Sequence, residues 1–242
     1  MNFPSPRFPW CRLVVLLVFL GTGAFAQASG SGGGSGHALA AALERAAPQA
    51  NPRVIALATR ALACVRKHRT VRTLSVIDYS LPSTTPRLWV FDLSQRSVLF
   101  HLLVAHGRNT GGQYAKHFSN REGSLMSSLG TFVTDGTYVG HNGYSLRLKG
   151  LDGRFNDQAE KRAIVIHGAS YVSRQFAKAQ GRLGRSWGCP AVRKSVAKPL
   201  IDTIRKQSVV FAYYPDKDWL HDAPTLVDCG DASTGTSSAL AP

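Results

Sequence analysis

Short apolar runs, many of them alternating with polar residues, follow one another from about Leu74 to Tyr214. Each run is rich in β-branched or aromatic residues and is bounded by Gly, Pro, Ser, Asn or Asp, which is typical of β-strands joined by turns. The runs are LSVIDYS, RLWVFDL, SVLFHLLVAHG, GTFVTDGTYVG, YSLRLKGLD, AIVIHG and SVVFAYYP. Because no long helix is predicted between most of them, they indicate a mainly β domain over residues 74–216, a largely antiparallel sandwich or open barrel.

Two other segments have the period of helices. Residues 37–70 contain the alanine-rich HALAAALERAAP and then PRVIALATRALACVRKH, in which Pro52 suits a first helical turn. We expect two helices here, which form a small N-terminal support packed on the β domain. Residues 195–207 predict one further helix, with Ser195 as its cap.

The flanking segments carry little information for folding. Residues 27–36 predict a flexible Gly/Ser linker, and residues 230–242 a disordered tail. Residues 1–26 have Arg7 and Arg12, then an apolar run, then AFA, which is the layout of a secretory signal peptide cleaved after Ala26. The apolar run is shorter than the ~20 residues that span a bilayer. We therefore expect a periplasmic or secreted protein with no stable membrane span after cleavage.

Basic residues outnumber acidic ones, 29 to 14, and give a net charge of +15. Such a balance favours a polyanionic partner. For an exported protein the available polyanions are cell-wall polymers, their peptide carboxylates and membrane headgroups, so we expect no nucleic-acid partner. A basic wall-binding protein without catalytic activity explains the charge equally well.

Export also changes the interpretation of the cysteines. Loss of Cys11 with the signal peptide leaves Cys64, Cys189 and Cys229, an odd number in an oxidising compartment. If Cys64 and Cys229 pair, they fasten the helical support to the end of the chain and leave Cys189 as a free thiol.

The sequence around Cys189 suits a nucleophile. His167 ends the run AIVIH, at a point where a side chain can leave a sheet for a cleft, and a glycine-rich loop then leads to SWGC. His167 is a candidate general base, oriented by a backbone carbonyl such as that of Gly168. Arg185 and Arg193 flank the thiol, and we expect Cys189 to be partly ionised at neutral pH.

The residues before Cys189 suggest how a substrate is held. Gly188 allows the backbone to approach a substrate carbonyl, and the amides of Gly188 and Cys189 are candidates for an oxyanion pocket. Ser186 and Trp187 then form its wall. From spacing alone other classes remain open, since Cys/His pairs transfer poorly between families.

Other chemistries have less support in the sequence. Neither paired cysteines nor an H-E-x-x-H helix occurs, so we expect no metal and no cofactor. Papain-like peptidases place the cysteine before the histidine, and here the order is reversed. A secreted nuclease suits the charge, but no histidine motif or acidic cluster for phosphodiester hydrolysis is found.

The motifs IHG and SWGCPAV together resemble those of the L,D-transpeptidase, or YkuD-like, catalytic domain. The stretches KHFSNREGSLMSSLGTFVT and YVGHNGYSLRLKGLDGRFND extend this resemblance to murein L,D-transpeptidase catalytic domains, over roughly residues 88–214. It implies a YkuD-like β-sandwich, no metal, Cys189 as nucleophile and His167 as base. Asn120 and Tyr138, which lie in these stretches, are candidate substrate-binding residues.

The resemblance also implies a substrate and a reaction. Cys189 would attack the L-centre carbonyl of the diamino acid in a peptidoglycan tetrapeptide stem and expel D-alanine, which leaves a thioester. A stem amine, a protein lysine, a D-amino acid or water then accepts the acyl group. Many relatives have histidine at the position of Trp187 and arginine at that of Ala191, so a substrate contact by Arg193 is the least supported of these roles.

Overall fold

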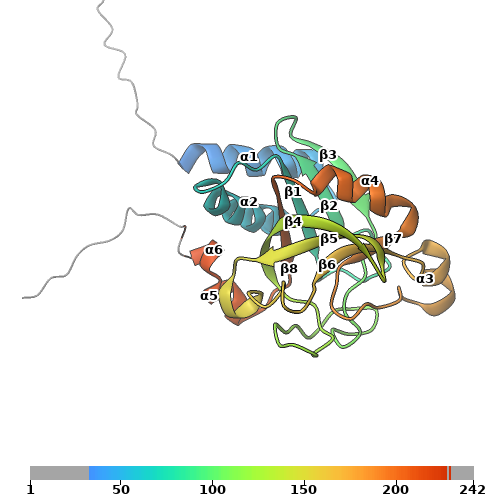
Figure 1. Ribbon diagram of the computed structural model, residues 1–242. Helices are drawn as coiled ribbons and strands as arrows, with labels where there is room; N and C mark the ends of the chain where they lie inside the picture. The colour runs from blue at the N-terminus through green and yellow to red at the C-terminus, as the bar shows by residue number, and fades with distance from the viewer. Residues whose placement is uncertain (1–32, 228, 230–242) are drawn as a thin grey trace, which may run out of the picture. The chain divides into compact units, whose positions relative to one another are not determined.

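An eight-stranded sheet forms the centre of the structure, a computed structural model that describes residues 33–227 and Cys229 (Figure 1). The strands run in the order β3-β2-β1-β8-β4-β5-β6-β7. Their bounds are β1 Thr73–Asp78, β2 Leu88–Asp92, β3 Ser97–Leu102, β4 Gly130–Gly140, β5 Gly143–Gly150, β6 Val165–Ala169, β7 Ala191–Arg193 and β8 Ser208–Tyr213. Every predicted strand is present, and the mainly β fold is confirmed. The predicted signal peptide (1–26) and tail (230–242) lie outside the described residues.

Most neighbouring strands are antiparallel, as predicted, but two pairs are parallel. These are β1 with β8 and β6 with β7. A parallel pair needs a crossover connection, and between β6 and β7 that connection contains the short helix α3 (Arg174–Gln180). Neither α3 nor the three-residue strand β7 was predicted.

The two edges of the sheet approach each other. The chain beyond β3 reaches β7, where the Ala105 N–H donates to the Ala191 carbonyl at 2.8 Å. The sheet therefore comes close to closing into a barrel, which is the open-barrel form of the predicted fold. This closure places residues 105–108 beside the segment that leads into β7.

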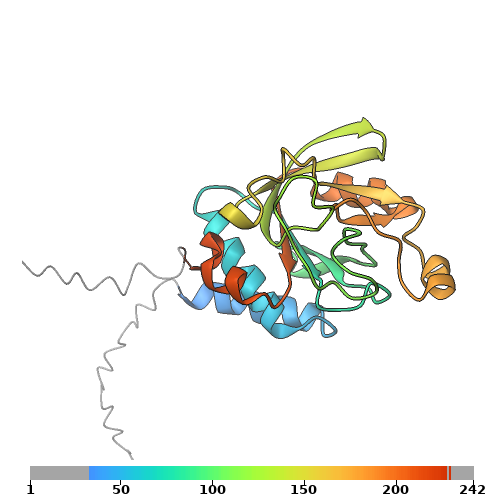
Figure 2. The same ribbon diagram turned by 90° about the horizontal axis from the view of Figure 1, so that it is seen from below.

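Helices cover the sheet at two places (Figures 1 and 2). Helices α1 (Gly33–Ala46) and α2 (Pro52–Arg66) pack on each other, and α2 contacts β1 and β8. Helix α4 (Lys194–Ile204), predicted over 195–207, contacts β5, β6 and β7. The short helices η1 (Gly153–Phe155), α5 (Lys217–Asp222) and α6 (Pro224–Val227) complete the fold. Among the described residues, no helix is both long and apolar enough to cross a membrane.

The helical support and the sheet share one hydrophobic core. Leu62 of α2, Val76 of β1 and Phe211 of β8 are fully or almost fully buried in the same cluster. The predicted helical support is present, but it begins earlier than the predicted residue 37. Helix α1 begins at Gly33, inside the predicted linker 27–36, because a helix that has already started extends at lower cost even through weak helix formers.

A disulfide joins Cys64 in α2 to Cys229, as predicted, across a sequence separation of 165 residues. Cys229 follows α6, which itself packs against α2. The bond therefore fastens the end of the described chain to the helical support. Cys189 is the free cysteine of the described residues.

We predict that the double variant Cys64→Ala/Cys229→Ala folds but loses stability. The chain-entropy model gives a loss on the order of 4 to 5 kcal/mol for a closed loop of more than a hundred residues. Urea unfolding of the variant and of the oxidised protein measures the difference. An unchanged midpoint would show that the bridge adds nothing to stability.

Candidate active site

The parallel pairing of β6 and β7 brings the segment of Cys189 beside the strand of His167. His167 pairs with Ala191, the first residue of β7, and Cys189 stands two residues before it, in the bend that leads into the strand. The Cys189 Sγ lies 3.7 Å from the Ala163 carbonyl oxygen, beside the start of β6, the strand that carries His167.

Both reactive groups are buried, and burial opposes their ionisation. Cys189 is only 9% exposed. Burial raises the pKa of its thiol, while the Val165 amide and the charge of Arg162 act in the opposite direction. Burial also lowers the pKa of His167. Both shifts favour a neutral thiol and a neutral imidazole in the resting pair, against the expectation that Cys189 is partly ionised.

The His167 ring is oriented by the backbone. Its Nδ1 lies 3.2 Å from the Gly168 carbonyl oxygen, where the sequence placed the orienting group. A neutral ring that donates from Nδ1 keeps a lone pair on Nε2 to accept a proton. Gly168 itself packs against α4, since a Cβ there would lie 2.9 Å from the Ala197 Cβ.

Ser186 holds the turn of the motif loop, which we define as residues 185–190. Its Oγ accepts from the Gly188 N–H at 3.1 Å and donates to the Cys189 carbonyl at 2.6 Å. Ser186 is buried, so its hydroxyl is committed to the loop and not to a substrate wall. The expected oxyanion role of the Gly188 amide is also contradicted, because a serine two residues before it takes that hydrogen bond.

The Cys189 amide is a free donor at the thiol itself. Among the described residues, no acceptor receives a hydrogen bond from the Cys189 N–H. It is therefore available to an oxyanion that forms at the thiol.

A second segment fixes the far side of the motif loop. The Ser127 hydroxyl donates to the Gly188 carbonyl at 3.0 Å and accepts from the Gly107 N–H at 3.0 Å. Gly188 has φ +127°, and a Cβ there would lie 2.8 Å from the Met126 carbonyl oxygen. Only glycine fits this position without strain.

Arg162 is a site residue that the sequence did not reveal. Its guanidinium donates to the carbonyls of Ser119 (2.7 Å) and Met126 (2.6 Å) and to the hydroxyls of Ser124 and Ser128. Its charge also lowers the pKa of the Cys189 thiol. Arg162 is 27 positions before Cys189 in a turn without a motif, so no local signal could have identified it.

The side chains of the other predicted cations, Arg185 and Arg193, are directed to other parts of the structure than the thiol. The Arg185 Nη1 donates to the carbonyls of Arg108 (3.0 Å) and Gly111 (3.1 Å). Arg193 lines a separate pocket of about 220 Å³ with His101 and other residues. Neither guanidinium is the charge that acts on the thiol of Cys189.

The remaining substrate-binding candidates fall into two groups. Trp187 is 74% exposed, directly before Gly188. Tyr138 pairs with Ser145, which pairs with His167, so Tyr138 lies two strands from His167 on the same face. Asn120 is not brought to this site, because its amide donates to Asp157 and to the Arg154 carbonyl and it lines a different pocket.

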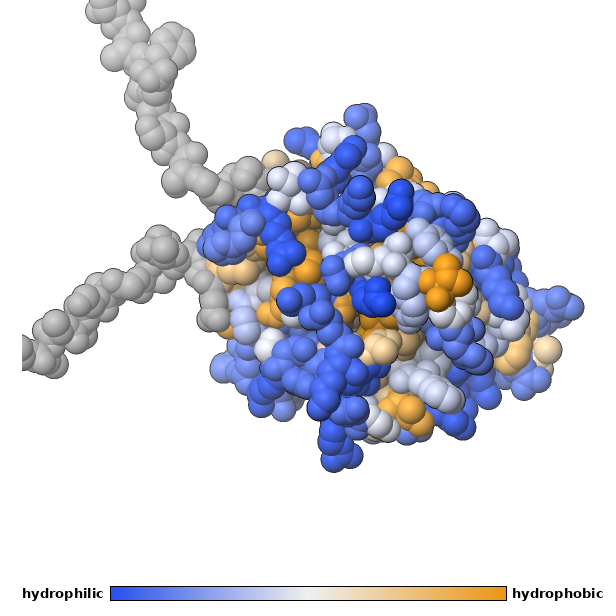
Figure 3. All heavy atoms as spheres, viewed as in Figure 1, coloured by the Kyte–Doolittle hydropathy of each residue, from blue (hydrophilic) through white to orange (hydrophobic). Residues whose placement is uncertain are grey.

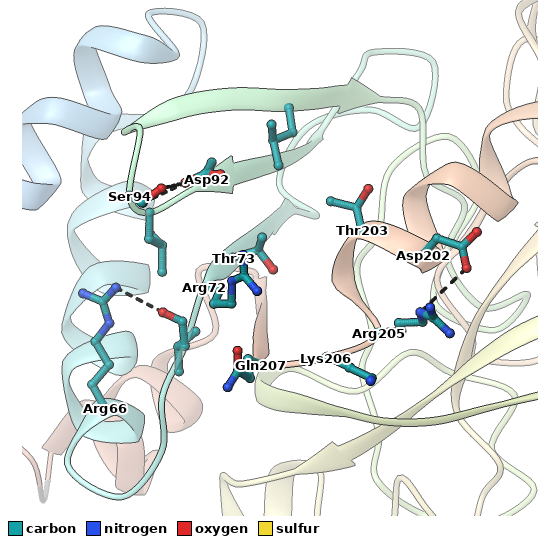
Figure 4. Close-up of a pocket in the computed structure, with 13 residues that line it drawn as sticks. Arg66, Arg72, Thr73, Asp92, Ser94, Asp202, Thr203, Arg205, Lys206 and Gln207 are labelled. Atoms are coloured by element: carbon teal, nitrogen blue, oxygen red, sulfur yellow. Dashed lines mark hydrogen bonds and ion pairs between the residues drawn. The ribbon is translucent and has the colours of Figure 1, made fainter.

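Of the two largest cavities described here, one contains His167 and the other lies away from the site. A pocket of about 460 Å³ contains His167, Gly168 and Tyr171, with the β4–β5 turn and α4 as its other walls. A second, of about 570 Å³, lies near the ends of α2 and α4 (Figure 4) and has neither cysteine nor histidine in its lining. Among the described residues, no group of three or more His, Cys, Asp or Glu side chains is placed to hold a metal ion.

We predict that Gly188→Ala disrupts the motif loop, because the new Cβ meets the Met126 carbonyl and the φ of +127° strains any other residue. The cost should be ~1–3 kcal/mol in unfolding free energy, with loss of Cys189 reactivity. Gly112→Ala is the matched control, since nothing lies within 4 Å of its Cβ position. Equal stability and thiol reactivity in both variants would contradict this account of the loop.

Comparisons with known proteins place the chain in a family. The L,D-transpeptidase catalytic domain family matches residues 46–213. No curated protein matches the chain. Among solved structures, the LD transpeptidase LdtMt1 in complex with imipenem has 14% identity and a TM-score of 0.37, with 59% of each chain covered.

Two further solved structures are similar. The L,D-transpeptidase from Mycobacterium smegmatis has 13% identity and a TM-score of 0.38, with 59% of each chain covered. The L,D-transpeptidase (Yku) from Stackebrandtia nassauensis has 12% identity and a TM-score of 0.35, with 71% of this chain and 74% of that one covered. The chain thus spans 59% of the length of the first two. Because the family match extends over well more than half of its residues, the chain belongs to the L,D-transpeptidase catalytic domain family.

Proposed function

We propose that this protein is an exported L,D-transpeptidase that acts on peptidoglycan tetrapeptide stems through a thioester on Cys189. The observation that carries the proposal is the pairing of β6 with β7, which brings the segment of the free thiol beside the strand of His167, with the Cys189 Sγ 3.7 Å from the Ala163 carbonyl oxygen. This is the nucleophile and base arrangement that acyl transfer requires.

The first half-reaction follows from the neutral resting pair. His167 Nε2 takes the thiol proton as Cys189 Sγ attacks the L-centre carbonyl of the diamino acid. The Cys189 N–H donates to the oxyanion of the tetrahedral intermediate. Collapse breaks the bond to D-alanine, whose amine takes the proton back from His167, and the thioester remains.

Arg162 and Val165 assist the same step. Both lower the pKa of the Cys189 thiol, so both stabilise negative charge on sulfur. The dry surroundings make these interactions stronger than they are in water. The thiolate is thus favoured when His167 removes the proton, although burial disfavours it at rest.

The second half-reaction depends on the acceptor. The amine of another stem gives a cross-link, and a protein lysine gives an anchored protein. A free D-amino acid gives exchange, and water gives the L,D-carboxypeptidase outcome. In each case neutral His167 can take the proton of the attacking group, as it does from Cys189.

The surroundings of the site support an anionic substrate outside the cytoplasm. The chain carries a net charge of +15, and hydrophilic side chains cover much of the face shown in Figure 3. Stem peptides carry several carboxylates and match that charge. The Cys64–Cys229 disulfide favours an oxidising compartment, the periplasm or the exterior.

We predict that Cys189→Ala abolishes D-alanine release from purified disaccharide-tetrapeptide, and that Cys189→Ser retains little of it. His167→Ala should lower the rate by ~10²–10⁴, the usual contribution of a general base. His68→Ala, an exposed histidine beyond α2, is the matched control and should have no effect. If Cys189→Ala releases D-alanine as fast as the native protein, the thioester route is wrong. If the native protein binds peptidoglycan but releases no D-alanine, the chain is instead a basic wall-binding protein without catalytic activity.

The pKa shifts of Cys189 and His167 predict how thiol alkylation and D-alanine release depend on pH. Because burial raises the pKa of Cys189 above its usual 9.0, the iodoacetamide rate should still increase beyond pH 9. Because burial holds the pKa of His167 below 6.5, D-alanine release should be nearly constant from pH 7 to 8. An alkylation rate that levels off below pH 7 would instead indicate a preformed thiolate–imidazolium pair.

A further inference from the structure

Three arginines gather beside the motif loop, and the proposed mechanism uses none of them. Arg185 is the first residue of the loop, and its guanidinium is held by the carbonyls of Arg108 (3.0 Å) and Gly111 (3.1 Å). The Arg108 N–H donates to the Ser186 carbonyl at 2.7 Å, so this backbone runs alongside the loop. Arg182 lies three positions before Arg185, and its Nη1 donates to the Leu183 carbonyl at 2.9 Å. We call these residues the arginine cluster (Arg108, Arg182 and Arg185).

The cluster is not neutralised within the described chain. None of its three side chains forms an ion pair within residues 33–227. Burial, and after it the charges of Arg182 and Arg108, lower the pKa of Arg185. Like charges held together without a counter-ion are unfavourable for the folded state, and such arrangements concentrate at functional sites.

Two of the arginines stand on a loop that packs against the pocket of His167. Gly184 lies against Tyr171, since a Cβ at Gly184 would be 2.4 Å from the Tyr171 Cβ, and the Gly184 N–H donates to the Tyr171 carbonyl at 3.0 Å. Tyr171 lines the pocket of His167. The loop that carries Arg182 and Arg185 is therefore packed on a wall of that pocket.

The distance to the nucleophile suits a short peptide. Arg185 and Cys189 are four residues apart, which is at most about 13 Å of extended chain. A tetrapeptide bound at Cys189 has a similar length. Carboxylates on such a stem can thus reach the cluster while the scissile carbonyl is at the thiol.

We propose that Arg108, Arg182 and Arg185 form a subsite that binds carboxylates of the stem peptide and selects carboxylated stems over amidated ones. This inference rests on the proposed function. Arginine is suited to the role because its planar guanidinium binds a carboxylate through two parallel hydrogen bonds. The subsite positions the donor and takes no part in proton transfer, so its loss should raise KM more than it lowers kcat.

The test compares Arg182→Glu with Arg60→Glu, an equal charge change on the exposed surface of α2. Each variant is assayed for D-alanine release from two tetrapeptide stems, one with free carboxylates and one with the carboxylates remote from the scissile bond amidated. Arg182→Glu should lower kcat/KM for the carboxylated stem at least ~10-fold, mainly through KM, with little change for the amidated stem. Arg60→Glu should affect neither stem.

Equal losses on both stems, or no loss on either, would overturn the subsite. Unchanged iodoacetamide alkylation of Cys189 in Arg182→Glu shows that the loop itself is intact. If alkylation changes, Arg108→Glu replaces it in the same comparison.

A binding measurement separates the subsite from the proposed reaction. Calorimetry with the Cys189→Ala variant should give tighter binding of the carboxylated stem than of the amidated stem. In the double variant Cys189→Ala/Arg182→Glu, the two stems should bind with equal affinity. This result holds even if the native protein releases no D-alanine, an outcome that would refute the proposed function alone. If inorganic phosphate displaces the carboxylated stem as readily as the free stem itself does, the cluster is a general anion site, and the proposed selection of carboxylates is wrong.

Discussion

The parallel pairing of β6 with β7 is the constraint on which the rest of the structure depends. It sets His167 opposite Ala191, and Cys189 stands two residues before Ala191 in the bend that leads into β7. A slip of one residue in this pairing would move the segment of the thiol along β6, away from its base. The same strand receives the bridge from Ala105, so the near-closure of the sheet and the placement of the nucleophile depend on the same three residues of β7.

A short strand cannot hold this arrangement by itself, and the loops around it supply the rest. Ser186 closes the motif loop from within, and Ser127 holds the Gly188 carbonyl from outside. Arg162 joins the loop of Ser119 and Met126 to the neighbourhood of the thiol. Each of these three side chains is held by at least two hydrogen bonds, so little reorganisation is needed when charge develops on Cys189. Burial raises the pKa of the thiol and so opposes its ionisation before a substrate is bound.

The sequence predicted the parts that depend on local pattern. The β-branched runs became strands, the periodic segments became α2 and α4, and the motif identified Cys189 and His167. It missed β7, because Ala191–Arg193 is too short to show a period, and α3, which the crossover requires. The sequence did not reveal Arg162, because its contacts join segments that are far apart in the chain. It also did not reveal that Ser186 binds the Gly188 amide, because that bond depends on the turn of the loop. For the same reason it assigned Asn120 to a substrate role, although that side chain holds the turn at Asp157.

The central claim is that Cys189 carries the acyl group, and mapped mass spectrometry tests it most directly. The native protein is incubated with disaccharide-tetrapeptide, quenched in acid and digested, and the peptide that contains Cys189 is weighed. The account predicts an added mass equal to the stem without its D-alanine, on Cys189 alone. Release of D-alanine with the acyl group on another residue, or with that peptide unmodified in acid-quenched samples taken during turnover, would contradict it.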